Sequence, residues 1–177
     1  MKTVTLLNRA VLATACAALT LSTVPTNATD TPDVRIGAIR ANAGITFVFT
    51  PTSDPLVFTA TVSGVIQTSL LGSCIDNAVL EVRFPSTPGR PVTVNGTATW
   101  TSIDGANSLR LTVAGTAAPD PANTAIFNNH YQITFTGGTG AYVTATGTAQ
   151  IDEVVMFTGP LTGTAAWTLK GTVVTAP

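Results

Sequence analysis

Hydrophobic and polar residues alternate with a period of two along most of the chain, which is the pattern of a strand with one buried face. In one window, Tyr131, Ile133 and Phe135 alternate with Gln132 and Thr134. Many of the polar positions are threonine, whose β-branched side chain and hydroxyl group suit the solvent face of a strand. The pattern predicts eight strands, at residues 45–50, 57–62, 80–84, 92–100, 109–113, 131–136, 143–151 and 165–172.

Turn-forming residues separate these windows, and no window after residue 28 shows the periodicity of a helix. Short strands at such spacing are typical of an antiparallel sandwich or barrel. The turn signals are Pro51 to Pro55, Pro85 to Pro91, Asp104-Gly105, Pro119-Asp120-Pro121, Gly137 to Gly140 and Gly159-Pro160.

Small residues on one predicted strand favour the barrel over the sandwich. Ala145, Gly147 and Ala149 share one face of that strand, and small inward residues fit the crowded interior of a narrow barrel. A barrel also has no open edges, which a chain with few lysines could not easily protect. We therefore expect an all-β fold, a closed antiparallel β-barrel of about eight strands.

The first 28 residues have the pattern of a signal peptide. Lys2 and Arg9 precede an apolar run at residues 11–24, and small residues follow up to Ala28. The run is short of the roughly 20 apolar residues that span a bilayer, so a membrane anchor is the weaker alternative. We predict cleavage after Ala28, a flexible arm at residues 29–42 and a barrel domain at 43–177, in a secreted, extracellular or periplasmic protein with no membrane span after cleavage.

Charge and cysteine content limit the chemistry that the chain can perform. Only 10% of its 177 residues are charged and the formal net charge is −1. The basic residues are scattered singly, so nucleic-acid binding, which needs clustered Lys and Arg, is excluded. Without the leader one cysteine, Cys74, and one histidine, His130, remain. A lone histidine cannot build a three-ligand zinc site, so we predict no metal and no cofactor, with Cys74 a small buried residue and His130 a polar residue at a strand start.

Few residues are candidates for a ligand site. Glu81 and Arg83 share one face of a predicted strand, which fits an ordinary surface ion pair. If that face were the barrel interior, the two side chains would form a polar ligand site, which we extend to Tyr131. Asp152 and Glu153 are adjacent, so their side chains should diverge to opposite faces, and we interpret them as solvated loop charges.

A glycine-rich hairpin gives the chain a family resemblance. Residues 135–147, FTGGTGAYVTATG, resemble the hairpin of the barrel shared by allene oxide cyclases and dirigent proteins, and look closest to its secreted bacterial members. Gln67 to Gly72 and Gly96 to Gly105 look similar as well. Ala141 stands where the family carries a basic residue. Glycines 137, 138 and 140 are interpreted as a structural turn that needs positive φ, with Tyr142 starting the next strand.

The resemblance implies either cyclisation of a fatty-acid epoxide or steering of phenoxy-radical coupling, and a homotrimer is common in the group. Three functions therefore stay open. The first is non-catalytic binding of a small apolar ligand or of a partner surface, which the few titratable groups favour. The second is an isomerase or cyclase for a hydrophobic substrate, or a dirigent-like steering protein, by analogy with the family. The third is a structural or adhesive role of the threonine-rich surface.

Overall fold

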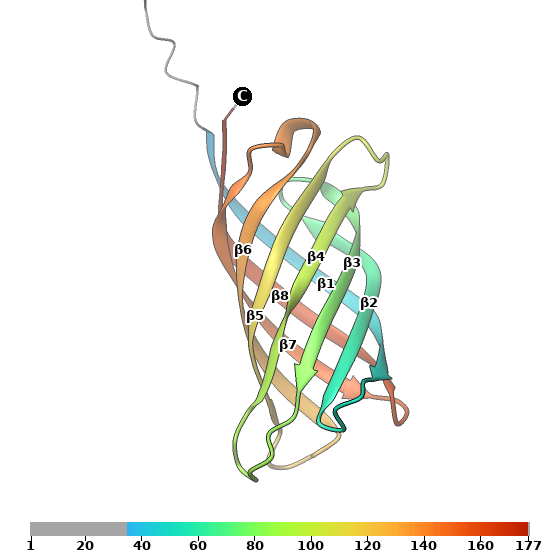
Figure 1. Cartoon of the computed structure of the whole chain (residues 1–177). Coiled ribbons are helices and arrows are strands. Elements are labelled where there is room, and N and C mark those ends of the chain that lie inside the picture. The colour runs from blue at the N-terminus through green and yellow to red at the C-terminus, as the bar shows by residue number, and fades with distance from the viewer. Residues whose placement is uncertain (1–34, 177) are drawn as a thin grey trace, which may run out of the picture. The chain divides into compact units, whose positions relative to one another are not determined.

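The computed structural model describes residues 35–176, so the expected leader at residues 1–28 lies outside the described part. Every pair of neighbouring strands is antiparallel, and the first strand pairs with the last, which closes the barrel (Figure 1). The predicted fold class is therefore confirmed. The strands are β1 Arg35–Pro51, β2 Val57–Thr68, β3 Gly72–Arg83, β4 Val92–Ser102, β5 Ser108–Pro119, β6 Ile126–Thr139, β7 Thr146–Phe157 and β8 Thr162–Thr175, and a short 3₁₀ helix, η1, spans Gly140–Tyr142.

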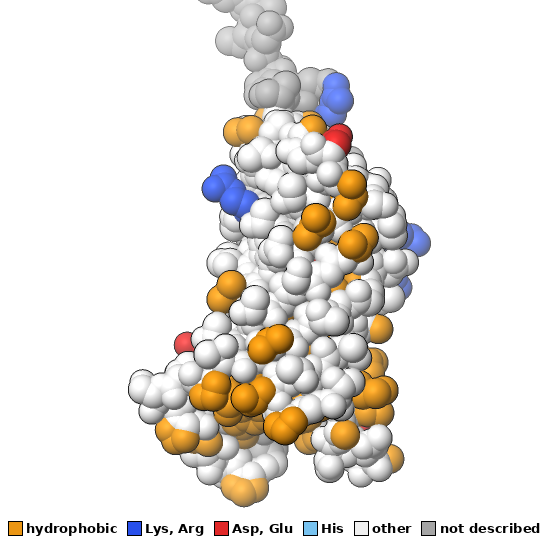
Figure 2. Space-filling model, turned by 90° about the vertical axis from the view of Figure 1, so that its right-hand side faces the viewer, with side chains coloured by type: hydrophobic (Ala, Val, Ile, Leu, Met, Phe, Trp, Pro, Cys, Tyr) orange, Lys and Arg blue, Asp and Glu red, His pale blue; other side chains and the backbone are white. Residues whose placement is uncertain are grey.

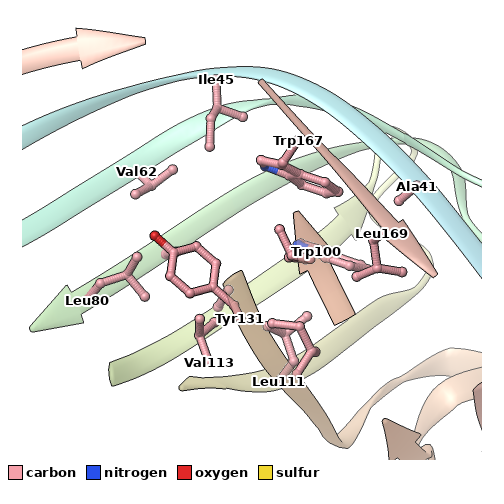
Figure 3. Packing of buried hydrophobic residues seen from close by; sticks show 14 of the residues in the cluster. Ala41, Ile45, Val62, Leu80, Trp100, Leu111, Val113, Tyr131, Trp167 and Leu169 are labelled. Carbon is pink, nitrogen blue, oxygen red and sulfur yellow. The ribbon is translucent and has the colours of Figure 1, made fainter. Parts of the chain in front are cut away.

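The period-two alternation places one side of every strand in the barrel interior. On β5, for example, Leu109, Leu111 and Val113 are buried while Arg110 and Thr112 are exposed. Side chains from all eight strands meet in a single hydrophobic core. Figure 3 shows part of this core, with Val62, Leu80 and Val113 around the side chain of Tyr131. Of the three small residues predicted to face inward, Ala145 and Ala149 are buried, although Ala145 precedes β7, and Gly147 is half-buried.

Four loops lie at the end of the barrel that is opposite to the C-terminus (Figure 1). They join β1 to β2, β3 to β4, β5 to β6, and β7 to β8, and we call this end the mouth. The other three connections lie at the opposite end. Within residues 35–176, no helix is long and apolar enough to cross a membrane.

Most strands are longer than the predicted windows, and three begin at a clearly different place. β1 begins at Arg35, so residues 35–42 belong to the barrel and not to a flexible arm, because Ile39 and Ala41 bury their side chains in the same phase as Ile45. β3 begins at Gly72, eight residues before the predicted window. β7 begins at Thr146, because η1 occupies the preceding residues.

The glycine-rich segment is only in part the predicted turn. Gly137 and Gly140 have positive φ, of 116° and 58°, but Gly137 lies within β6 at a bulge opposite Arg110 and Leu111. Gly138 also lies in β6, where glycine is needed because there is no room for a side chain. An added Cβ would collide with the Ser108 carbonyl oxygen. Tyr142 ends η1 instead of starting β7.

Candidate ligand site in the barrel interior

Among the described residues, four with carboxyl, amide or phenol groups are buried in the barrel, besides the hydroxyl residues Thr68, Ser102 and Ser108. Asp76 comes from β3, Asn129 and Tyr131 from β6, and Glu153 from β7. Each of them is less than a tenth exposed, with exposed fractions of 4% to 9%. Buried polar groups are costly unless they are hydrogen-bonded, so their partners define what this interior can bind.

Asn129, Tyr131 and Glu153 form a closed triangle of hydrogen bonds. Register brings Asn129 directly opposite Glu153 on the neighbouring strand. The Asn129 Nδ2 group donates to Glu153 Oε2 at 2.7 Å and to Tyr131 Oη at 2.6 Å. The Tyr131 hydroxyl in turn donates to Glu153 Oε2 at 2.9 Å. One carboxyl oxygen therefore accepts two hydrogen bonds among residues that are each less than a tenth exposed.

Burial controls the protonation of this triangle. Desolvation raises the pKa of Glu153, although the hydrogen bonds from Asn129 and Tyr131 oppose the rise. Burial also raises the pKa of Tyr131, and the charge of Glu153 adds to that effect. Both shifts favour the neutral acid forms. A neutral carboxylic acid in an apolar pocket can donate a hydrogen bond or a proton.

Asp76 is a second buried carboxyl group in the same interior. Burial raises its pKa to about 7, the Trp100 side chain lowers it as a hydrogen-bond partner, and the charge of Glu153 raises it. Asp76 Oδ1 has no hydrogen-bond partner within residues 35–176. Because Asp76 and Trp100 are directly opposite in the β3–β4 register, the indole reaches the carboxyl group from the neighbouring strand.

A small cavity lies beside the triangle. Its volume is about 60 Å³, and its walls are almost entirely aliphatic and aromatic. The only polar residues that line it are Asn129, Tyr131 and Glu153. A cavity of this size holds more than one water molecule but is well below the roughly 150 Å³ that accommodates a benzene ring.

A ring of phenylalanines separates this cavity from the mouth. The mouth carries an open hollow of about 610 Å³ among loop residues such as Leu56 and Leu161. In Figure 2, hydrophobic side chains gather toward this end of the barrel. The hollow and the cavity share four lining residues, Phe49, Phe84, Phe127 and Phe157. Together with Phe47 and Phe58 these rings contact one another at centroid distances of 5.2 to 5.8 Å.

The structure does not bring the predicted ligand residues together. Glu81 and Arg83 lie on the outer face of β3, where Arg83 contacts Glu81 at 3.4 Å and Asp54 at 3.3 Å, all with side chains about half exposed. They form the ordinary surface ion pair, and the condition for an interior site is not met. Tyr131 alone of the three points inward.

Two predictions about single residues have clear outcomes. Cys74 is fully buried, as predicted, and burial raises its thiol pKa to about 11. His130 is an exposed residue of β6, and its Nδ1 lies 2.7 Å from Asp152 Oδ1. Neither residue contributes to the interior site.

The interpretation of Asp152 and Glu153 as solvated loop charges is wrong for Glu153 in full, and for Asp152 in its position, since Asp152 is solvated but lies in a strand. Both residues lie within β7, and the predicted divergence is correct, since Asp152 is exposed and Glu153 buried. The sequence did carry a signal that the Glu153 side chain faces inward, because Glu153 continues the alternate inward positions of Ala149 and Ile151. Asp76 was missed because the predicted third strand began too late, although Cys74 and Ala78 flank it in the same phase.

Comparisons with known proteins add one structural likeness. No family model matches the chain, and no curated protein matches it. A solved structure, that of the pterocarpan synthase dirigent protein GePTS1, is similar over 80% of this chain and 86% of its own, with 13% sequence identity and a TM-score of 0.36. The resemblance of the glycine-rich hairpin to dirigent proteins, allene oxide cyclases and their secreted bacterial members stays a prediction.

Proposed function

We propose that the protein binds a small apolar ligand through the mouth of its barrel. The observation that carries this proposal is that the open hollow adjoins the interior cavity, with four phenylalanines that line both. Concave apolar sites with a few convergent polar groups are the usual form of a small-molecule site. Here the apolar walls would supply affinity, and the triangle of Asn129, Tyr131 and Glu153 would orient the ligand.

A neutral fluorescent probe tests the proposal. N-phenyl-1-naphthylamine should gain fluorescence on binding to the purified protein. Phe84→Asp places a charge between hollow and cavity and should weaken binding by about tenfold or more, since burying an unpaired charge is costly. Val79→Asp is the matched control, because Val79 is 55% exposed on the outer wall of β3. Equal binding to both variants and the natural protein would contradict binding at the mouth.

A second candidate function is acid-assisted isomerisation or cyclisation of a hydrophobic substrate. It is favoured by one observation, the buried Glu153 carboxyl group, whose pKa burial raises. In this candidate Glu153 would donate its proton to the epoxide oxygen as one C–O bond opens, a hydride would shift between the two former epoxide carbons, and the resulting protonated carbonyl group would return the proton to Glu153. Tyr131 would hold the carboxyl group in position. The test is consumption of an alkyl epoxide, 1,2-epoxyoctane, which Glu153→Gln should abolish while the epoxide still binds. Unchanged consumption by that variant would exclude Glu153 as the acid.

A further inference from the structure

The side-chain amide of Asn129 has one atom without a partner. An amide carries two N–H donors and one carbonyl acceptor. The Nδ2 group uses its donors on Tyr131 Oη and Glu153 Oε2, at 2.6 and 2.7 Å. Asn129 Oδ1 is buried, yet it accepts no hydrogen bond from any residue between 35 and 176. While Glu153 Oε2 acts as an acceptor, turning the amide over would set Oδ1 against it, acceptor against acceptor, so Oδ1 is the atom left without a partner.

Glu153 supplies the complementary donor. Its Oε2 atom already accepts hydrogen bonds from Asn129 and Tyr131. The proton of the neutral acid, which burial favours, is therefore placed on Oε1. Glu153 and Asn129 both line the cavity. Side by side, they offer one donor and one acceptor, which is the pattern that a single hydroxyl group satisfies by accepting from one and donating to the other.

The dimensions of the cavity select the shape of the ligand. About 60 Å³ of space beside the triangle is too small for an aromatic ring, since a benzene site needs roughly 150 Å³. A hydroxyl group with the first carbons of an unbranched chain fits this volume. The rest of such a chain would pass between Phe49, Phe127 and Phe157 into the hollow of the mouth, where the lining is apolar.

We infer that the interior site binds an unbranched aliphatic alcohol, with its hydroxyl group between Glu153 and Asn129 and its alkyl chain in the ring of phenylalanines. This inference rests on the proposed function and adds the chemical class of the ligand. An ether accepts from Glu153 but has no proton for Asn129 Oδ1. A carboxylate likewise has no proton to donate, and it would bring another negative charge toward two buried carboxyl groups, Glu153 and Asp76.

Calorimetric titration with three matched ligands tests the inference. The probes are 1-octanol, heptyl methyl ether and octanoate, which have similar chains and different head groups. We expect 1-octanol to bind about tenfold or more tightly than the ether or the carboxylate, because both leave the buried acceptor unpaired. Asn129→Leu should abolish the preference for the alcohol over the ether, while Gln132→Leu, an exposed position of the same strand, should retain it.

A second variant keeps the inference testable if Asn129→Leu does not fold. Glu153→Gln carries an amide that can still accept from Tyr131 and donate to the alcohol, so the preference for the alcohol should survive. Equal affinity for the three chains, or tighter binding of phenol than of 1-octanol, would overturn the ligand class and leave binding at the mouth intact. Absence of binding by all of them and by N-phenyl-1-naphthylamine would overturn both proposals.

Discussion

The indole rings of Trp100 and Trp167 stack inside the barrel, with centroids 5.9 Å apart and planes inclined by 17° (Figure 3). Trp100 is directly opposite Asp76 in the β3–β4 register, and Trp167 is directly opposite Glu153 in the β7–β8 register. The stack therefore connects the two strand pairs that carry buried carboxyl groups. Through this stack, β4 and β8 contact each other across the barrel interior.

Replacing one of these indoles should destabilise the whole barrel. Trp167 is 5% exposed, so Trp167→Leu would lose the ring contact with Trp100 and leave a cavity, at a cost of about 3 kcal/mol. Urea unfolding followed by circular dichroism measures the free energy. The neighbouring outward residue provides the control, since Thr168→Val should change stability by only about 0.5 kcal/mol. Similar stabilities of the two variants would contradict a supporting role for the stack.

Asp76 should make the barrel less stable as the pH rises. Its folded pKa is about 7, against an ordinary value of 3.8, so between these values the folded state binds a proton that the unfolded state has released. Stability contributed by this proton is fully present below the unfolded pKa and is lost as the pH rises through the folded value. At 1.36 kcal/mol for each pKa unit, the loss is about 4 kcal/mol as an upper limit. Burial of Glu153 acts in the same direction.

Urea unfolding at about pH 4 and about pH 8 measures this dependence. Asp76→Asn cannot ionise, so the variant should show a much smaller loss of stability between the two conditions. It should also be more stable than the natural protein at the higher pH. The surface substitution Asp54→Asn is the control and should leave the slope nearly unchanged, because the Asp54 side chain is about half exposed and contacts an arginine, Arg83, rather than a histidine. A natural protein that gains stability toward alkaline pH would contradict the buried, protonated Asp76.

The alternation of the sequence was sufficient to predict the fold but not its polar interior. Tyr131, Ile133 and Phe135 were expected to share one buried face, and all three are buried. Period two identifies which residues share a face, and the closed barrel follows from strand number and small inward residues. The strand ends were less predictable. Residues 35–42 look irregular because Arg35 and Arg40 interrupt the apolar series, yet Arg40 is exposed on the outer face of β1 and Arg35 is exposed as the first residue of the strand.

Glu153 and Asp76 show why the candidate site could not be predicted from the sequence. A carboxyl group is usually solvated, so composition argues against placing it inside even when its phase in the strand is correct. What stabilises Glu153 there is Asn129, which is 24 positions away in sequence and becomes its neighbour only through the β6–β7 register. Such a pair depends on exact register, which alternation alone does not determine.

Removing the Tyr131 hydroxyl group should weaken the hydrogen-bonded triangle, while the aromatic ring stays packed in the core. Tyr131→Phe removes the donor to Glu153 and the acceptor for one Asn129 N–H. A buried donor without a partner costs about 1–3 kcal/mol, so we expect a loss of this size in urea unfolding. Ile133→Val on the same inner face is the control for a slight loss of packing, at about 1 kcal/mol. No loss of stability in Tyr131→Phe would mean that the hydroxyl group is not needed as a partner.

Two glycines on strands should respond oppositely to a methyl group. At Gly138 an added Cβ would collide with the Ser108 carbonyl oxygen, which belongs to the adjacent strand backbone and cannot move aside as a flexible side chain can. Gly138→Ala should therefore cost about 1–3 kcal/mol. At Gly44 no atom lies within 4 Å of an added Cβ, and the residue has ordinary extended backbone in β1. Gly44→Ala should raise stability by about 0.5 kcal/mol, because it restricts the unfolded chain.

Thermal unfolding of both alanine variants, alongside the natural protein, measures whether their stability changes have opposite signs. A lower midpoint for Gly138→Ala together with an equal or higher midpoint for Gly44→Ala would match the close approach of β5 and β6 at Gly138. If both variants lost stability equally, the cost would come from a property common to glycines in these strands. In that case the positive φ of Gly137 and Gly140 would be the structural reason for glycine in this segment, and the close approach at Gly138 would not.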